Sequence, residues 1–241
     1  MSKYTIHDLK KHNNEKVQFE TAFLVILLRP ISNILAVFLS NLGIKPNFVT
    51  FLNYFIVISS PFFLFFHDNG LILFTFMLLI WQMLDIVDGN IARLTNTFST
   101  LGGSVDHLTG MHISAFLPFI FGLYDFNNPS NFFFDNNSYS LILGSIGSIF
   151  SILLRFIDLY LSTENKDDFV SNLRYGNSPK NLFELCVMIV RQFEYPGGLL
   201  IIILCSFALM GMLDIAVLFY FVLYILFYIS FVMLLIFRRL L

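Results

Sequence analysis

The chain has 241 residues, of which 57% are hydrophobic and 12% are charged, and its mean hydropathy is +0.77. A soluble domain of this size could not bury so many apolar side chains and still cover its surface, so we expect an integral membrane protein. The net charge of −2 excludes a strongly basic nucleic-acid-binding protein, and no nucleic-acid partner is expected.

The N-terminal region, residues 1–42, has an ambiguous pattern. Residues 22–40 are long enough to span a bilayer, but Arg29 and Pro30 stand in the middle of this apolar run. A span here would move the basic tail before it to the external side, against the preference of Lys and Arg for the cytoplasmic side. We therefore predict that residues 1–42 form a cytoplasmic tail and a broken amphipathic helix lying at the membrane interface.

The rest of the chain, residues 43–241, is predicted to be an all-α domain of six transmembrane helices, because only helices satisfy the backbone of such spans. The predicted spans are residues 46–66, 71–93, 103–124, 139–162, 197–213 and 215–237. The first, third and fifth connections contain no Lys or Arg, which predicts cytoplasmic termini and an external Asn-rich loop at 127–137. The fourth connection, 163–196, is expected to contain an interfacial amphipathic helix at 181–193.

Three carboxylates stand at the cytoplasmic ends of the second and third predicted spans. Asp85 and Asp88 are three residues apart and share one helix face, and Asp106 follows a short connection. Three converging carboxylates repel one another unless a cation is bound, and hard oxygen ligands favour Mg²⁺, Mn²⁺ or Ca²⁺ over zinc. A structural ion pair is the alternative, but charged residues within a membrane more often mark a functional site.

The residues beside these carboxylates suit a phosphate-bearing ligand. Gly89 and Ala92 leave room for a flat ligand or a neighbouring helix, and Arg93 offers a fork of donors suited to phosphate. The sequence therefore predicts a metal-dependent site for a nucleotide that carries a pyrophosphate.

The same segment resembles the CDP-alcohol phosphotransferase signature D-x2-D-G-x2-A-R-x8-G-x3-D-x3-D. Seven of the eight fixed positions match, namely Asp85, Asp88, Gly89, Ala92, Arg93, Gly102 and Asp106. "RPIS" at 29–32 and "KPNFVT" at 45–50 also resemble the family's N-terminal helix and the start of its first span. The resemblance implies that a substituted phosphate moves from a CDP-linked alcohol to a second alcohol, with release of CMP.

The resemblance also implies Mg²⁺ or Mn²⁺ on Asp85, Asp88 and Asp106, Asn47 near the nucleotide, and a homodimer in a lipid membrane. An N-cap role is the structural alternative for Asn47. Basic residues that hold a phosphorylated acceptor are expected near Arg155, with Arg191 as a further candidate, whereas a simple pair between Arg155 and Asp158 is the alternative.

The eighth signature position departs from the pattern, because Gly110 replaces the Asp expected as metal ligand and general base. His107, directly after Asp106, is the nearest substitute proton acceptor, so Asp106 and His107 are the catalytic candidates. His112 is a weaker candidate, and a structural helix-end histidine is the alternative for both. Two other interpretations stay open: a catalytically silent homologue that binds CDP-alcohol, and a transporter, which would more typically show internal repeats.

Overall fold

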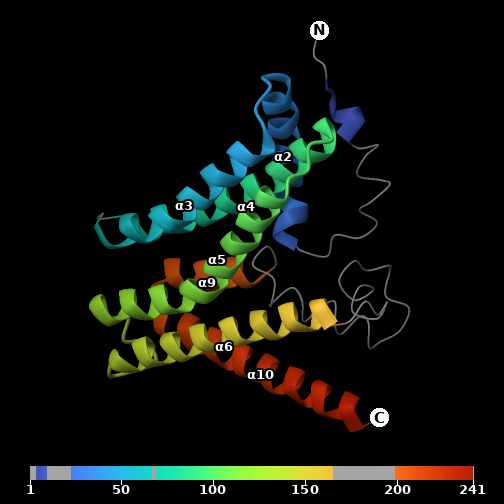
Figure 1. Cartoon of the computed structure of the whole chain (residues 1–241). Coiled ribbons are helices and arrows are strands. Elements are labelled where there is room, and N and C mark those ends of the chain that lie inside the picture. The colour runs from blue at the N-terminus through green and yellow to red at the C-terminus, as the bar shows by residue number, and fades with distance from the viewer. Residues whose placement is uncertain (1–3, 10–22, 67–68, 165–198, 241) are drawn as a thin grey trace. The chain divides into compact units, whose positions relative to one another are not determined.

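The computed structural model describes residues 4–9, 23–66, 69–164 and 199–240. Within these ranges the chain is helical and contains no strand, which confirms the predicted all-α class. The helices are α2 (Phe23–Asn41), α3 (Pro46–Phe66), α4 (Gly70–Thr95), α5 (Thr100–Asn127), α6 (Ser138–Glu164), α9 (Leu199–Leu209) and α10 (Leu213–Leu240) (Figure 1).

The chain forms two compact units, and α5 contributes to both. The first unit contains α2, α3, α4 and the start of α5 up to Gly110, and the second contains α5 from Met111, α6, α10 and α9 from Ile202. The predicted interfacial helix at 181–193 lies outside the described residues.

In the first unit, α4 packs against both α2 and α3 (Figure 1). Their contact is an apolar core made by residues of all three helices, namely Ala36, Val49, Leu84, Val87 and Ile91. Leu84, Val87 and Ile91 are spaced at intervals of three and four residues, so they form one stripe along α4. Residues of this stripe lie before and after Asp88 in the sequence, so their packing sets the rotation of α4 about its axis. That rotation determines the direction in which Asp88 points.

The predicted break in the N-terminal helix is wrong, because α2 continues through Pro30 from Phe23 to Asn41. Pro30 lacks an N–H and so leaves the carbonyl of Ile26 without its usual partner, but both residues are exposed. The other face of α2 is held on α4, where buried Ser32 donates from Oγ to the carbonyl of Met83 at 3.3 Å. Packing on one face therefore keeps the helix continuous.

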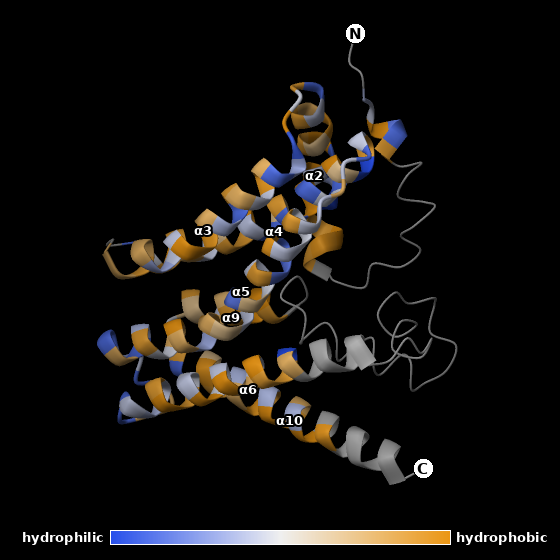
Figure 2. Ribbon diagram, in the orientation of Figure 1, coloured by the Kyte–Doolittle hydropathy of each residue, from blue (hydrophilic) through white to orange (hydrophobic). Residues whose placement is uncertain are grey.

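Four helical segments are long and apolar enough to cross a membrane. They are Leu24–Asn41, Pro46–Phe66, Gly70–Thr95 and Ser138–Phe156. The last three coincide with predicted spans, and the first meets the same criterion although the charge pattern predicts an interfacial position for it. Figure 2 shows apolar residues along most of the length of α3 and α6.

The remaining predicted spans correspond to helices outside that set. The third corresponds to α5, whose first ten residues include Gly, Ser, Thr, Asp and His. The fifth and sixth correspond to shorter apolar helices, Leu200–Leu209 and Leu213–Ile229. The number of six spans therefore stays a prediction.

In the second unit, a proline in α5 determines the polar contacts among three helices. Pro118 has no N–H, so the carbonyl of Ser114, four residues earlier, lacks its usual helical donor. Two buried hydroxyls replace that donor: Ser151 Oγ of α6 donates to the carbonyl at 2.9 Å and Tyr220 Oη of α10 donates at 2.6 Å. The freed carbonyl thus links α5 to α6 and α10.

Two buried aspartates hold the loop that follows α5. Asp125 Oδ1 accepts hydrogen bonds from the backbone N–H and the hydroxyl of Ser130, at 3.0 and 2.7 Å. Asp214, just before the predicted span 215–237, accepts hydrogen bonds from the N–H groups of Phe133, Phe134 and Ile215. Burial by itself would raise the pKa of Asp214, but these donors outweigh it and hold the pKa below its usual value of 3.8.

Candidate active site

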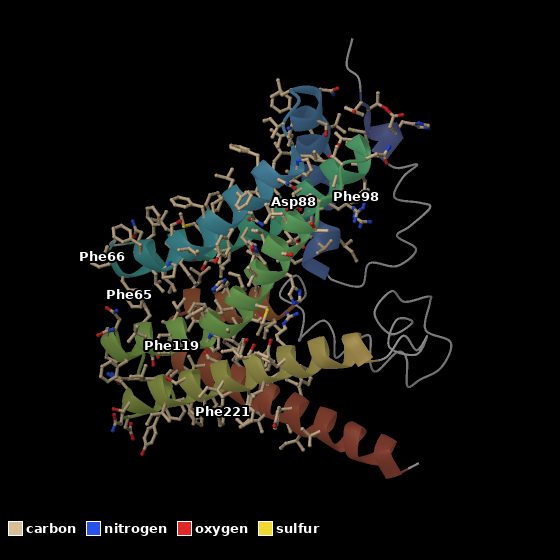
Figure 3. All side chains as sticks on the ribbon, in the orientation of Figure 1. Phe65, Phe66, Asp88, Phe98, Phe119 and Phe221 are labelled. Atoms are coloured by element: carbon tan, nitrogen blue, oxygen red, sulfur yellow. The ribbon has the colours of Figure 1, made fainter. Side chains whose placement is uncertain are left out.

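The acidic residues of α4 lie toward one end of the first unit. Figure 3 shows Asp88 toward the end that carries Phe98 and away from Phe65 and Phe66. The Asp88 side chain is 7% exposed, and its Oδ2 accepts a hydrogen bond of 2.7 Å from the Thr50 hydroxyl of α3. Thr50 therefore fixes one oxygen of the Asp88 carboxylate.

The connection from α4 to α5 is set by two local signals. Asn96 ends α4 in the left-handed conformation (φ 52°, ψ 35°), which Asn tolerates better than most residues. Ser99 is the N-cap of α5, where its Oγ accepts a hydrogen bond of 2.8 Å from the N–H of Gly102. This short connection places the start of α5 directly after the acidic end of α4.

Asn47 joins the start of α3 to the same connection. Ser99 Oγ donates to Asn47 Oδ1 at 3.0 Å, so the Asn47 side chain acts as an acceptor across the loop. A Cβ at Gly102 would lie 2.6 Å from Asn47 Oδ1, closer than real Cβ contacts allow. A side chain at Gly102 would therefore displace the Asn47 amide from its contact with Ser99, so glycine at this position lets Asn47 keep that contact.

Asp106 brings a second carboxylate near Asp88. Asp106 and His107 are exposed on the first turns of α5, and Asp106 is close enough for its charge to oppose that of Asp88. Asp85 is partly buried on α4. In the part of the chain that the structure describes, no three His, Cys, Asp or Glu side chains are gathered closely enough to hold a metal ion.

Arg93 follows Asp88 by five residues on α4 and acts favourably on its charge. Arg93 Nη1 donates to Asn90 Oδ1 at 2.9 Å, and Asn90 Nδ2 donates to Asn33 Oδ1 of α2 at 2.9 Å. A Cβ at Gly89 would lie 3.9 Å from Arg93 Nη2, an ordinary contact, so the guanidinium lies over the glycine. Ala92 is buried, and its small side chain belongs to the packed side of α4.

The CDP-alcohol phosphatidyltransferase family model matches residues 44–171, which is more than half of the chain. The chain belongs to this family. The match includes Asn47, the whole signature from Asp85 to Gly110, and Arg155. A comparison with curated proteins finds no match.

The family's eighth signature position has room for a larger residue. A Cβ at Gly110 would meet no atom within 4 Å, and the backbone of Gly110 is helical. Close packing therefore does not require glycine at position 110, and the helical backbone there would accept an Asp.

The residues predicted to hold a phosphorylated acceptor, the weaker proton-acceptor candidate His112 and the alternative partner Asp158 lie in the second unit or outside the described residues. Arg155 Nη2 donates to Ser114 Oγ at 3.0 Å. His112 stacks on Phe116 with the two ring centroids 5.5 Å apart. Neither the side chain of Asp158 nor any part of Arg191 is among the residues described.

Four side chains form hydrogen bonds that hold the site residues in place but were not themselves predicted as site residues. Thr50 stands within "KPNFVT", so its position in that motif was the available signal. Ser99 directly precedes a helix, which is typical of an N-cap. Asn33 and Asn90 carry no local signal, because their contact joins residues 57 positions apart.

Proposed function

We propose that the chain is an active CDP-alcohol phosphotransferase. It transfers a substituted phosphate from a CDP-linked alcohol donor to an alcohol acceptor and releases CMP. The observation that carries this proposal is the arrangement in the first unit, where Asp88, Asp106 and Arg93 interact electrostatically and seven of eight signature residues are present. Charged side chains in apolar helices are costly to maintain, which argues for their use.

Carboxylate oxygens are the donors that a hard divalent cation prefers, and this donor set supports a metal site although the described side chains are not gathered around one point. Asp88 and Asp106 repel each other in the described geometry, and a cation between such groups relieves that repulsion. We assign Asp85, Asp88 and Asp106 as the ligands that would hold Mg²⁺ or Mn²⁺. The bound ion would polarise the phosphoryl oxygens of the donor. Thr50 holds Asp88 in orientation, and Arg93 binds the diphosphate. Gly89, Gly102 and Asn47 shape the nucleotide side of the site, and Ala92, on the packed side of α4, lets a neighbouring helix come close.

His107 is the proposed proton acceptor. It is exposed on α5 directly after Asp106, and an imidazole nitrogen can serve as a general base. The proton leaves the acceptor hydroxyl as its oxygen attacks phosphorus, the P–O bond to CMP breaks, and the proton moves to an imidazole nitrogen.

The remaining parts of the proposal concern the acceptor and the membrane. Arg155 is a candidate to hold a phosphorylated acceptor, and a lipid or a polar phosphorylated alcohol would supply the hydroxyl. The protein is proposed to be a homodimer in a lipid bilayer with both termini cytoplasmic. Residues 1–42 would form the interfacial part and residues 43–241 the six-span domain.

A silent homologue is the second candidate, and Gly110 favours it. Without the eighth carboxylate the site lacks an expected base and ligand, so the protein would bind a cytidine nucleotide with metal and release no CMP.

The decisive experiment measures CMP release. The purified protein in lipid vesicles is incubated with radiolabelled CDP-alcohols, several alcohol acceptors and Mn²⁺, with Asp88→Asn as the inactive control. Acceptor-dependent CMP release by the wild type supports the enzyme. Metal-dependent CDP binding without release by the wild type, together with gain of release in Gly110→Asp, supports the silent homologue.

A further inference from the structure

A chain of hydrogen bonds runs from α2 to the signature arginine. Asn33 of α2 accepts from Asn90 of α4 at 2.9 Å, and Asn90 in turn accepts from Arg93 at 2.9 Å. Asn90 is 1% exposed, so its amide group is removed from water and depends on these partners. Asn33 precedes the matched family region, and Asn90 occupies a variable position of the signature.

The chemistry of the side chains fixes the direction of this chain. A guanidinium has donors and no acceptor, so Asn90 must turn its Oδ1 toward Arg93. Its Nδ2 then faces α2, where it needs an acceptor, and Asn33 Oδ1 is that acceptor. Without Asn33 the buried Nδ2 of Asn90 loses this acceptor, so the amide is held less firmly and its Oδ1 no longer fixes the position of the Arg93 guanidinium.

We propose that Asn33 and Asn90 are positioning residues that hold the Arg93 guanidinium in place for the donor's diphosphate. This inference rests on the proposed function. It makes α2 a part of the active site, because a residue of that helix controls an arginine on α4. The buried contact between Ser32 and Met83 lies on the same pair of helices but does not lead to Arg93, so it supplies a matched control.

The first test measures the accessibility of Arg93 without any ligand. Phenylglyoxal modification of Arg93 is followed by mass spectrometry in the wild type, Asn33→Leu, Asn33→Asp and Ser32→Ala. Asn33→Leu is expected to raise the rate, whereas Asn33→Asp keeps an acceptor for Asn90 and is expected to restore the wild-type rate. An equal rise in Ser32→Ala and Asn33→Leu would mean a general loosening of α2 and would overturn the positioning role.

The second test measures binding of CDP in the presence of Mn²⁺ by calorimetry. Asn33→Leu is expected to weaken CDP binding roughly 10-fold, because a charge-assisted hydrogen bond would be misaligned. Ser32→Ala is expected to leave CDP binding unchanged. In an Arg93→Lys background Asn33→Leu should have little further effect, because the two residues act through one contact. A full effect in that background contradicts the inference. A wild type that fails to bind CDP contradicts the proposed function, whereas an Arg93 labelling rate unchanged by Asn33→Leu overturns the positioning role.

Discussion

The two units bury polar side chains for different purposes. In the first unit the buried polar side chains form hydrogen bonds with charged ones. Thr50 donates to Asp88, and Asn90 accepts from Arg93. In the second unit the buried hydroxyls of Ser151 and Tyr220 complete the carbonyl of Ser114 that Pro118 leaves free, and among these three residues only Ser114, through its hydroxyl, has a hydrogen bond with a charged group, Arg155, in the contacts described above. The difference suggests that polar residues in apolar helices are of two kinds, those that prepare charges for a ligand and those that repair the backbone.

Asp88→Asn should have the largest effect and would test the first kind directly. Loss of the charge is expected to lower CMP release on the order of 1,000-fold, because the site relies on fixed electrostatic interactions. Asp85→Ala and Asp106→Ala should act in the same direction. The measurement is turnover with Mn²⁺, with protein folding checked by thermal unfolding.

Asp125→Asn is the matched control, because Asp125 is 2% exposed but holds a loop of the second unit. It should lower stability and leave Mn²⁺-dependent CDP binding intact. Unchanged Mn²⁺ affinity in a folded Asp88→Asn variant would remove Asp88 from the metal site.

His107→Ala should come next, with a loss of at least roughly 100-fold in turnover and little change in CDP affinity. The separation is expected because a proton acceptor acts in the chemical step and contributes little to donor binding. Turnover and calorimetric titration of the same preparations measure the two quantities. Normal turnover in His107→Ala would assign proton removal to another group while leaving the metal site in place.

Tyr220→Phe tests the second kind of polar residue. The Ser114 carbonyl would keep its hydrogen bond from Ser151 but lose the shorter one from Tyr220. We expect the free energy of unfolding to fall by about 1 kcal/mol and turnover to stay unchanged. Thermal unfolding in detergent compares this variant with Tyr139→Phe, whose tyrosine is 53% exposed and should be neutral. A large loss of turnover in Tyr220→Phe would show that the second unit also prepares the site.

The smallest expected effect is the pH dependence that Asp214 provides. Its pKa is lower in the folded protein than in the unfolded chain, so its contribution to stability is complete above the ordinary Asp value of 3.8. The contribution is lost as the pH falls from there through the folded-state pKa. Asp214→Asn should therefore differ most from wild type near neutral pH, and the two unfolding midpoints should converge in strong acid. A constant difference between them would contradict the role of its ionised form.

Much of the first unit could be predicted from local sequence. Helical periodicity placed Asp85 and Asp88 on one face, and the signature spacing placed Asp106 at the start of the next helix. The all-helical class followed from composition, because the backbone of apolar spans must satisfy itself. These inferences depend on contacts within a few residues or on composition alone, which a sequence displays directly.

The tertiary structure decided the features that depend on distant residues. Pro30 suggested a broken helix, yet packing on α4 keeps α2 continuous. Pro118 leaves the carbonyl of Ser114 without its helical donor, and only the arrangement of α5, α6 and α10 determined which hydroxyls replace that donor. The contact between Asn33 and Asn90 has no pattern in sequence for the same reason, since a hydrogen bond depends on where two helices meet and not on their spacing along the chain.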